Sequence, residues 1–141
     1  MDQLTFTGFL PAGVTGKDVN VVLCRLFGDA VLNSIIEFTG SEQTLASIPI
    51  DDRLTISNMT TEFGALGEIF LVDEKLISWY RANATTAAMM NSPTSERINH
   101  VRIGELEENK LVADLGAVYA KKLSTLSPFV SGPNSVKVAI R

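Results

Sequence analysis

Two polar side chains in the stretch DDRLTISNMTTEFGAL, residues 51–66, are the best candidates for chemistry. Asn58 and Glu62 are four residues apart, so on a helix both would point from the same face. Aligned at the edge of a buried face, an amide that donates and accepts hydrogen bonds and a carboxylate that accepts them could reach into a cleft. An apolar stripe at helical spacing runs beside them, formed by Ile56, Met59, Phe63 and Leu66. The pattern alone fits the solvated flank of an amphipathic helix better than it fits a site.

The other reactive side chains occur singly. Cys24 is the only cysteine, so the chain can form no internal disulfide and cannot by itself hold a metal or cluster that needs several thiolates. We expect Cys24 to be a small hydrophobic core residue rather than a nucleophile. His100 has no second ligand at metal spacing, so we expect a solvated histidine. The Gly13–Lys17 run is not a phosphate-binding loop, because Pro11 stands at its first glycine position and Asp18 at the position of its hydroxyl residue.

Composition limits the class of protein. With 141 residues, 45% of them hydrophobic, and a mean hydropathy of +0.19, the chain is long enough for one globular domain with its own core. The net charge of -4 and the pI near 4.9 come with no run of Lys or Arg. We therefore expect neither nucleic acid nor an anionic membrane as a partner. The N-terminus shows no targeting segment, and no apolar run reaches the length of a membrane span.

Alternating strands and helices must position Asn58 and Glu62. Thr15 and Asp18 form a shortened capping box at the start of one predicted helix. Glu37 interrupts a predicted strand, and we expect its carboxylate on the open face of the sheet rather than reaching toward a cleft. The strands are expected at Leu4–Leu10, Ser34–Thr39 and Ile69–Val72, and the helices at Thr15–Gly28, Ser41–Ser47, Asp51–Leu66 and Asp73–Ala82.

The chain is predicted to consist of three parts. Residues 1–82 form an α/β core segment, residues 83–110 a connector with one short helix at most, and residues 111–141 a strand region that completes the domain. Strand-like alternation marks Ala117–Leu123 and Asn134–Ile140 in the last part. The predicted fold class is α/β: a single three-layer-like domain with a mixed or mostly parallel sheet flanked by helices.

Four stretches together resemble the aconitase family of hydro-lyases. In chain order they are PAGVTGKDV, IEFTGSEQTL, DDRLTISNMTTEFGAL and YAKKLSTLSPFVSGPNSVKV. The G-V-T-x-K-D turn, the I-E-F-x-G strand and the T-I-x-N-M-x-x-E-x-G-A helix are similar across the family. The segment S-T-L-S-P-F-V-S-G-P-N-S-V is similar to its homoaconitase branch. The resemblance covers most of residues 8–82 and 111–139, and it implies that the domain is part of the aconitase fold.

The resemblance also implies a reaction. Members of this branch isomerise homocitrate to homoisocitrate through cis-homoaconitate, in lysine biosynthesis by the aminoadipate route. They use a 4Fe-4S cluster in which one iron acts as a Lewis acid. Asn58 and Glu62 match the asparagine and glutamate of the family's N-M-x-x-E helix and are carried over as catalytic residues. The family's cluster cysteines, in an S-C-T-N motif and a C-x-x-C pair, do not occur here, so we expect no cofactor-binding or metal-ligating residue in this chain.

The chain therefore resembles an internal fragment, predicted to be inactive alone. Its implied partners are the remaining domains of the parent enzyme and a hydroxy-tricarboxylate substrate. The implied location is the mitochondrial matrix for a fungal protein and the cytoplasm otherwise. Three alternatives stay open: a fragment of isopropylmalate isomerase or aconitase, a stand-alone non-catalytic binding module with this fold, and a subunit that mainly docks onto a cluster-bearing partner.

Overall fold

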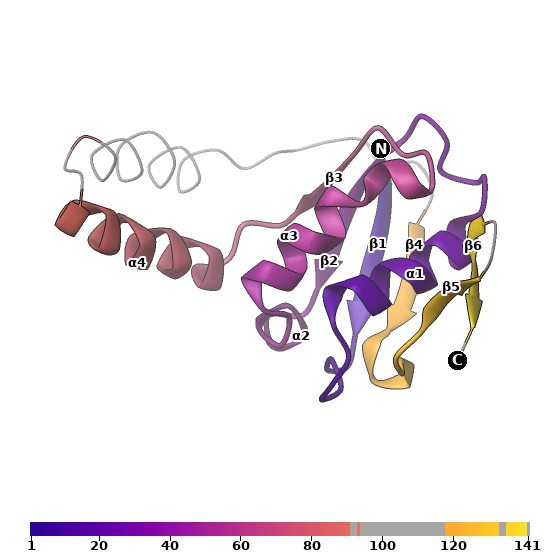
Figure 1. Ribbon diagram of the computed structural model, residues 1–141, viewed down its shortest axis with the longest axis horizontal. Coiled ribbons are helices and arrows are strands. Elements are labelled where there is room, and N and C mark those ends of the chain that lie inside the picture. Colours follow the sequence, from indigo (N-terminus) through magenta and orange to yellow (C-terminus); the bar gives the residue numbers. More distant parts are fainter. Residues whose placement is uncertain (91–92, 94–117, 133–134, 141) are drawn as a thin grey trace. The chain divides into compact units, whose positions relative to one another are not determined.

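The computed structural model describes residues 1–90, 93, 118–132 and 135–140 (Figure 1). The chain consists of two compact units. The first contains Met1–Leu71 and Asp114–Arg141, and the second contains Val72–Ala113. His100 lies outside the described residues, so the solvated histidine stays a prediction.

A four-stranded parallel sheet is the centre of the first unit. Its strands are β1 (Asp2–Thr7), β2 (Ile35–Gly40), β3 (Gly67–Phe70) and β4 (Val118–Lys122), in the spatial order β3-β2-β1-β4. The connections between the first three strands contain the helices α1 (Gly16–Phe27), α2 (Glu42–Ala46) and α3 (Ile50–Asn58) and the 3-10 helix η1 (Thr60–Glu62). A 3-10 turn, η3 (Leu123–Thr125), and an antiparallel hairpin, β5 (Val130–Gly132) and β6 (Ser135–Ile140), follow β4. The predicted α/β fold class and the mostly parallel sheet are confirmed.

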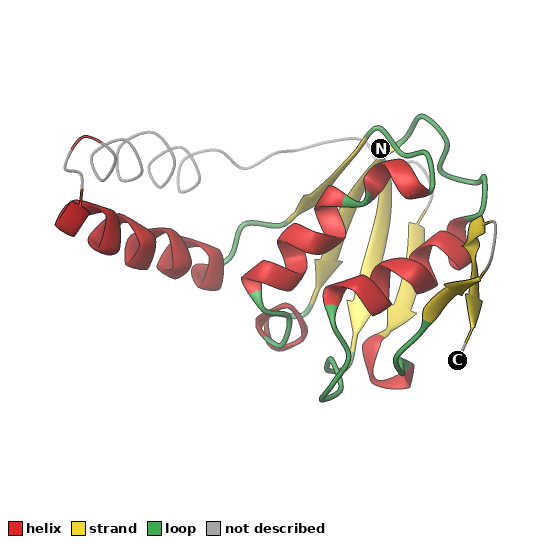
Figure 2. Cartoon of the chain, in the orientation of Figure 1, coloured by secondary structure: helices red, strands yellow, loops and turns green. Residues whose placement is uncertain are grey.

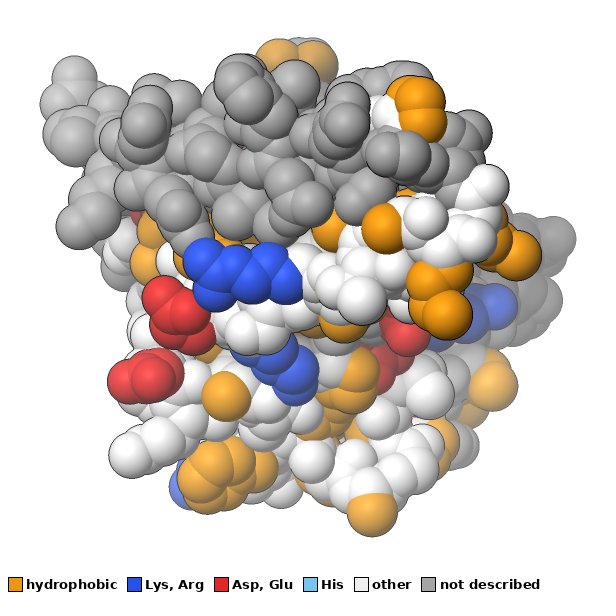
Figure 3. Space-filling view, turned by 90° about the vertical axis from the view of Figure 1, so that its left-hand side faces the viewer, with side chains coloured by type: hydrophobic (Ala, Val, Ile, Leu, Met, Phe, Trp, Pro, Cys, Tyr) orange, Lys and Arg blue, Asp and Glu red, His pale blue; other side chains and the backbone are white. Residues whose placement is uncertain are grey.

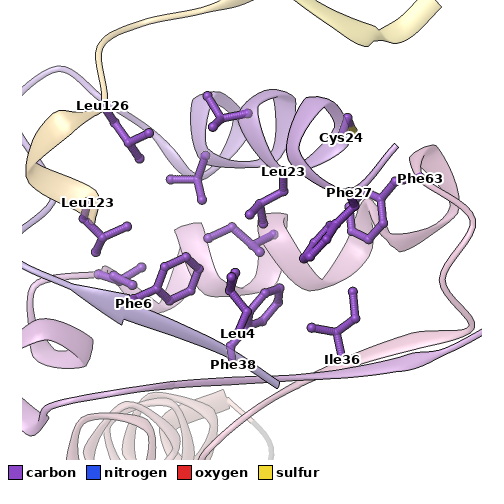
Figure 4. Packing of buried hydrophobic residues seen from close by; sticks show 14 of the residues in the cluster. Leu4, Phe6, Leu23, Cys24, Phe27, Ile36, Phe38, Phe63, Leu123 and Leu126 are labelled. Carbon is purple, nitrogen blue, oxygen red and sulfur yellow. The ribbon is translucent and has the colours of Figure 1, made fainter. Parts of the chain in front are cut away.

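Two helices, α1 and α3, cover one face of this sheet (Figure 2). The side chains that fill the space between helices and sheet are large and apolar, and the rings of Phe6 and Phe38 stack with centroids 5.3 Å apart. Each such side chain contributes about 1.5–3 kcal/mol when it leaves water, which holds both helices on the sheet. Figure 4 labels Leu4, Phe6, Leu23, Cys24, Phe27, Ile36, Phe38, Phe63, Leu123 and Leu126 in this core.

Helix α1 begins with the predicted capping box. The Asp18 carboxylate accepts hydrogen bonds from the backbone N–H and the hydroxyl of Thr15, at 2.9 and 2.7 Å. Its other oxygen accepts the backbone N–H of Phe129 at 2.9 Å, so one carboxylate ties the start of α1 to the C-terminal part of the first unit. Partial burial opposes ionisation, but these hydrogen bonds outweigh it and hold the pKa of Asp18 below its ordinary value.

We expect Asp18→Asn to destabilise the chain by about 1–2 kcal/mol at neutral pH, because an amide has one acceptor oxygen where the carboxylate uses two. A lowered pKa means that the contribution of Asp18 is present above its unfolded-state pKa and is lost as the pH falls. The difference between variant and wild type should therefore shrink in acid. Urea unfolding of both proteins at neutral and acidic pH measures this difference in the free energy of unfolding. Asp51→Asn, at an exposed position in the first turn of α3, is the control, and a difference that grows in acid would contradict the assignment.

Helices α1 and α3 run side by side in a fixed register. The N–H of Gly16 donates to Asp52 Oδ1 at 2.7 Å, and Asn20 Nδ2 donates to the carbonyl of Ile56 at 3.1 Å. Gly16 and Asn20 are four residues apart on α1, and their partners Asp52 and Ile56 are four residues apart on α3. The two bonds therefore lie one turn apart along both helices. Gly16 allows this close approach, because a Cβ at that position would lie 2.5 Å from the Asp52 carbonyl oxygen.

Replacing Gly16 by alanine should therefore separate the two helices. The atoms that the new methyl group would meet belong to the backbone of Asp52 and cannot rotate away. We expect Gly16→Ala to lower the free energy of unfolding by about 1–3 kcal/mol, the usual cost of overpacking. The matched control is Gly67→Ala, where a Cβ would meet nothing within 4 Å. Urea unfolding of the two variants should separate them, and equal stabilities would contradict the close contact.

Most predicted elements are found, with corrected bounds. The first strand ends at Thr7 rather than Leu10, because Gly8 turns the chain with φ of +76°. The predicted strand at Ile69–Val72 is instead β3, Gly67–Phe70, at the edge of the sheet. Ile69 is consequently 36% exposed and not in a buried run. The predicted strands at the C-terminus correspond to β4 and β6, whereas β5 lies between them, outside both predicted strands.

Helix α4 (Glu74–Met90) belongs to the second unit. Asp73, the predicted first residue of this helix, caps it, since its Oδ1 accepts the N–H of Leu76 at 2.9 Å. The helix continues through Met90, beyond the expected end at Ala82, because the alanine-rich sequence that follows favours a helix. The predicted division of the chain at residues 82 and 110 stays a prediction. None of the described helices is long and apolar enough to cross a membrane.

Candidate functional site

Asn58 and Glu62 lie close together in the chain at the end of α3, but they do not share one α-helix. Helix α3 ends at Asn58, and the chain continues as η1 over Thr60–Glu62. The predicted helix over Asp51–Leu66 is therefore wrong in its last two turns. Leu66, expected in the apolar stripe, is 70% exposed.

The hydrogen bonds after Ile56 explain this change of helix type. The carbonyl of Ile56 accepts the N–H of Met59 at 3.3 Å, three residues on instead of four. The carbonyl of Ser57 accepts the hydroxyl of Thr60 at 2.7 Å, and the N–H of Glu62 donates to the Met59 carbonyl at 3.1 Å. A 3-10 path has three residues per turn, so side chains four apart no longer point the same way. The prediction that Asn58 and Glu62 point from the same helical face is therefore wrong, although the two residues remain close together in the chain.

The end of α3 lies at the edge of the sheet where the parallel strands begin. Because β2 and β3 are parallel, the helix that joins them must return the chain to the starting edge. Two hydrogen bonds fix this return: Leu66 N–H donates to the Ser34 carbonyl at 2.7 Å, and Asn33 N–H donates to the Gly64 carbonyl at 3.0 Å. Within this frame Asn58 is exposed and Glu62 is half-buried. Both can therefore meet a ligand or a protein surface from outside the first unit.

Phe63, the residue after Glu62, is fully buried against Phe27 of α1, with ring centroids 5.3 Å apart. The two rings are tilted against each other, and their contact anchors the segment that follows η1, so that the peptide carrying Glu62 is attached to the core on one side. Asn58 is held through its own helix. The two candidate side chains are thus fixed by different contacts.

Cys24 is the core residue that the sequence predicts. It lies on the inner side of α1 and is 1% exposed. Burial raises the pKa of its thiol to about 11, and the negative charges of Glu62 and Glu68 act in the same direction. The thiol is therefore protonated at neutral pH and is a poor nucleophile.

Glu68 is a residue that the sequence analysis missed. It lies in β3 opposite Ile36 of β2, and it is two residues from Phe70, so its side chain points to the helix-covered face of the sheet. Both carboxylate oxygens are buried and have no hydrogen-bond partner among the described residues. Burial raises the pKa of Glu68 to about 8. The sequence could have revealed Glu68, because it is two residues from Phe70, and residues two apart on a strand point to the same face.

Glu37, which the sequence analysis also considered, lies away from this site. Glu37 lies on the sheet face opposite α1 and α3, where its Oε2 accepts a hydrogen bond from Gln3 Nε2 at 3.0 Å, although it is only 9% exposed. Within the described residues no group of three or more His, Cys, Asp and Glu side chains could hold a metal ion. Basic and acidic side chains both appear on the face drawn in Figure 3, beside separate apolar ones.

The comparisons with known proteins agree on one family. The aconitase family (aconitate hydratase) matches residues 2–141. The chain is 62% identical over 142 residues to the mitochondrial homoaconitase of Gibberella zeae and 60% identical over 144 residues to that of Neurospora crassa. Each match covers 97% of this chain and 18% of the relative. The mitochondrial homoaconitase of Candida albicans is 51% identical over 142 residues, with 20% of its length covered. The chain thus spans about a fifth of the length of the curated relatives it matches.

Proposed function

This chain belongs to the aconitase family, and from that premise we propose that it is one segment of a homoaconitase-type hydro-lyase. The observation that carries the proposal is the identity of 51–62% over 97% of the chain to fungal proteins named homoaconitase. The whole enzyme would remove water from homocitrate to give cis-homoaconitate and return water at the neighbouring carbon to give homoisocitrate. The reaction is a step of lysine biosynthesis by the aminoadipate route. The relatives' names support a mitochondrial location if the chain is fungal.

Asn58 and Glu62 would form one wall of the active site in that enzyme. The half-buried carboxylate of Glu62 can accept a hydrogen bond from a hydroxyl or water and take up its proton. The exposed amide of Asn58 can donate to one substrate oxygen and accept from another group. Neither residue is held by a side-chain partner that would have to be displaced among the described hydrogen bonds. Substrate would lie between this surface and the remaining domains of the parent enzyme.

The 4Fe-4S cluster of the family does not fit this chain. A cluster of that kind needs several thiolates, and the chain has one cysteine. Cys24 is buried inside the core, and its pKa of about 11 keeps the thiol protonated. We propose that the cluster is held entirely by other parts of the longer enzyme. We therefore assign to this chain the positioning of substrate and water and the proton transfer at Glu62, and none of the chemistry of the cluster.

Cluster reconstitution tests this division of roles. After anaerobic treatment with iron and sulfide, the 141-residue chain should contain no stoichiometric iron and show no cluster absorbance. The longer enzyme treated in the same way should show both. A cluster that forms on residues 1–141 alone would overturn the proposal.

A substrate competition separates homoaconitase from its relatives. The longer enzyme should form the unsaturated intermediate from homocitrate, followed by its ultraviolet absorbance, and should act on isopropylmalate or citrate only weakly. Preference for isopropylmalate would assign the chain to an isopropylmalate isomerase, and preference for citrate would assign it to an aconitase. No activity on any of the three would favour a non-catalytic binding module with this fold.

A further inference from the structure

We propose that Asn20, a residue of α1 outside the candidate site, is the positioning residue that ends α3 at Asn58. By ending the helix there it determines where Asn58 and Glu62 lie. The consequence for catalysis rests on the proposed function, whereas the geometry rests on hydrogen bonds within the first unit.

Asn20 is a polar side chain in an apolar place. It is 0% exposed, and it faces α3 from the helix that packs beside it. Its Nδ2 donates to the carbonyl of Ile56 at 3.1 Å, whereas its Oδ1 is buried without a hydrogen-bond partner among the described residues. An incompletely satisfied amide in a core costs free energy relative to an apolar side chain of similar size. Its presence is explained if the bond to Ile56 has a function other than stability.

The bond to Ile56 occupies the acceptor that would continue the helix. In an α-helix the carbonyl of Ile56 would accept the N–H of Thr60. A carbonyl oxygen has two lone pairs, and here Asn20 Nδ2 and the N–H of Met59 use both. The N–H of Thr60 therefore loses its α-helical acceptor. The next carbonyl, that of Ser57, already accepts the hydroxyl of Thr60, and the chain leaves α3 as the 3-10 helix η1.

The rigid pairing of the two helices keeps Asn20 in this place. One turn earlier, the N–H of Gly16 donates to Asp52 Oδ1 at 2.7 Å, and no side chain separates the two backbones there. This contact fixes α1 along the axis of α3, so that the Asn20 amide faces Ile56 and not a neighbouring carbonyl. A residue of α1, 36 positions from Ile56, thereby sets the end of another helix.

The test is Asn20→Leu in the 141-residue chain, followed by nuclear magnetic resonance. Without the amide, the carbonyl of Ile56 can accept the N–H of Thr60, and we expect α-helical carbon shifts to extend from Asn58 through Glu62. The amide of Thr60 should become about tenfold or more better protected from hydrogen exchange, as a new α-helical bond requires. Unchanged shifts at residues 57–62 in the folded variant would overturn the proposal.

Val19→Ala is the matched control, because Val19 is buried on the same helix without a bond to α3 among the described contacts. It should lower stability while leaving the shifts of residues 57–62 unchanged. A second measurement needs no variant. In the wild-type chain the side-chain NH₂ protons of Asn20 should exchange about tenfold or more slowly than those of the exposed Asn58. Equal exchange rates would contradict the bond to Ile56, whether or not Asn20→Leu folds.

Kinetics of the longer enzyme test the catalytic consequence. There Asn20→Leu should lower kcat about 10–100-fold through misplacement of Asn58 and Glu62, while KM changes by less than about threefold. Wild-type kcat combined with the altered shifts would overturn the positioning role in catalysis. If the wild-type enzyme does not act on homocitrate, the proposed function fails, and the measurements on the 141-residue chain still decide whether Asn20 ends α3.

Discussion

Replacing Glu62 by glutamine in the longer enzyme that contains this chain is expected to lower kcat for homocitrate by about 100-fold or more. Glutamine has the same shape as glutamate but cannot take up a proton. Glu62 is half-buried at the surface of the first unit, so the exchange leaves the packing below it unchanged. Steady-state rates with homocitrate and with cis-homoaconitate measure the effect in both directions of water transfer.

The matched control for this experiment is Glu42→Gln. Glu42 is exposed in the first turn of α2, which follows the end of β2 and thus lies at the opposite edge of the sheet from the end of α3. Its exchange should leave kcat and KM near their wild-type values. Equal rates for the Glu62→Gln and Glu42→Gln enzymes would remove Glu62 from the catalytic residues, and Asn58 would then need its own test by Asn58→Ala.

The parts of the fold that the sequence predicts well depend on neighbours in the chain. Thr15, Asp18 and Gly28 mark the start and end of α1, because a cap and a C-terminal glycine act within a few residues. Ser41 marks the start of α2 in the same way, since its hydroxyl accepts the N–H of Thr44. Such local signals are readable before any tertiary contact is known.

The end of α3 could not be predicted in this way. The stretch from Asp51 has a continuous helical pattern, and no glycine or proline interrupts it before Gly64. The donor that occupies the carbonyl of Ile56 belongs to Asn20, in another helix. Periodicity carries no information about such a donor, so the pattern extended the helix through both candidate residues. The family resemblance selected the same two residues for a different reason, their place in a motif.

The position of a strand within its sheet is equally hidden in the sequence. The apolar run at Ile69–Val72 is typical of a buried parallel strand, but β3 lies at the edge, because strand order depends on contacts between distant segments. Glu68, just before that run, was not considered. Pairing with Ile36 turns its side chain into the core, where a carboxylate is unexpected.

The 141-residue chain is expected to lose stability between pH 5 and pH 8 because of Glu68. Burial raises the pKa of this carboxyl group from 4.5 to about 8 in the folded chain. Between these values the folded state holds a proton that the unfolded state has released, so the free energy of unfolding falls by about 1.4 kcal/mol per pH unit. The contribution of the neutral carboxyl is fully present below pH 4.5 and is lost as the pH rises to about 8.

Glu68→Met should remove this dependence. The carboxylate oxygens have no hydrogen-bond partner among the described residues, so an apolar side chain of similar length breaks none of the described bonds. From acid to pH 7 the advantage of the variant over the wild type should grow by about 3 kcal/mol, because pH 7 lies 2.5 pH units above the unfolded-state pKa. Below pH 4.5, where the wild-type carboxyl becomes neutral in both states, this pH-dependent part should disappear, and only the cost of burying a neutral carboxyl group without a hydrogen-bond partner among the described residues should remain. Urea unfolding at pH 4.5, 6, 7 and 8 measures both slopes.

Glu42→Gln serves again as the control, since an exposed carboxylate should leave the wild-type slope unchanged. Parallel curves for the wild type and Glu68→Met would show that the folded chain hydrates or pairs the carboxylate.

The same comparison in the longer enzyme separates two explanations for a buried carboxyl group in this place. If the pH dependence disappears there while it persists in the 141-residue chain, a group outside this chain pairs with Glu68. If it persists in both, Glu68 is neutral in the longer enzyme as well, in the strand β3 two residues from Phe70.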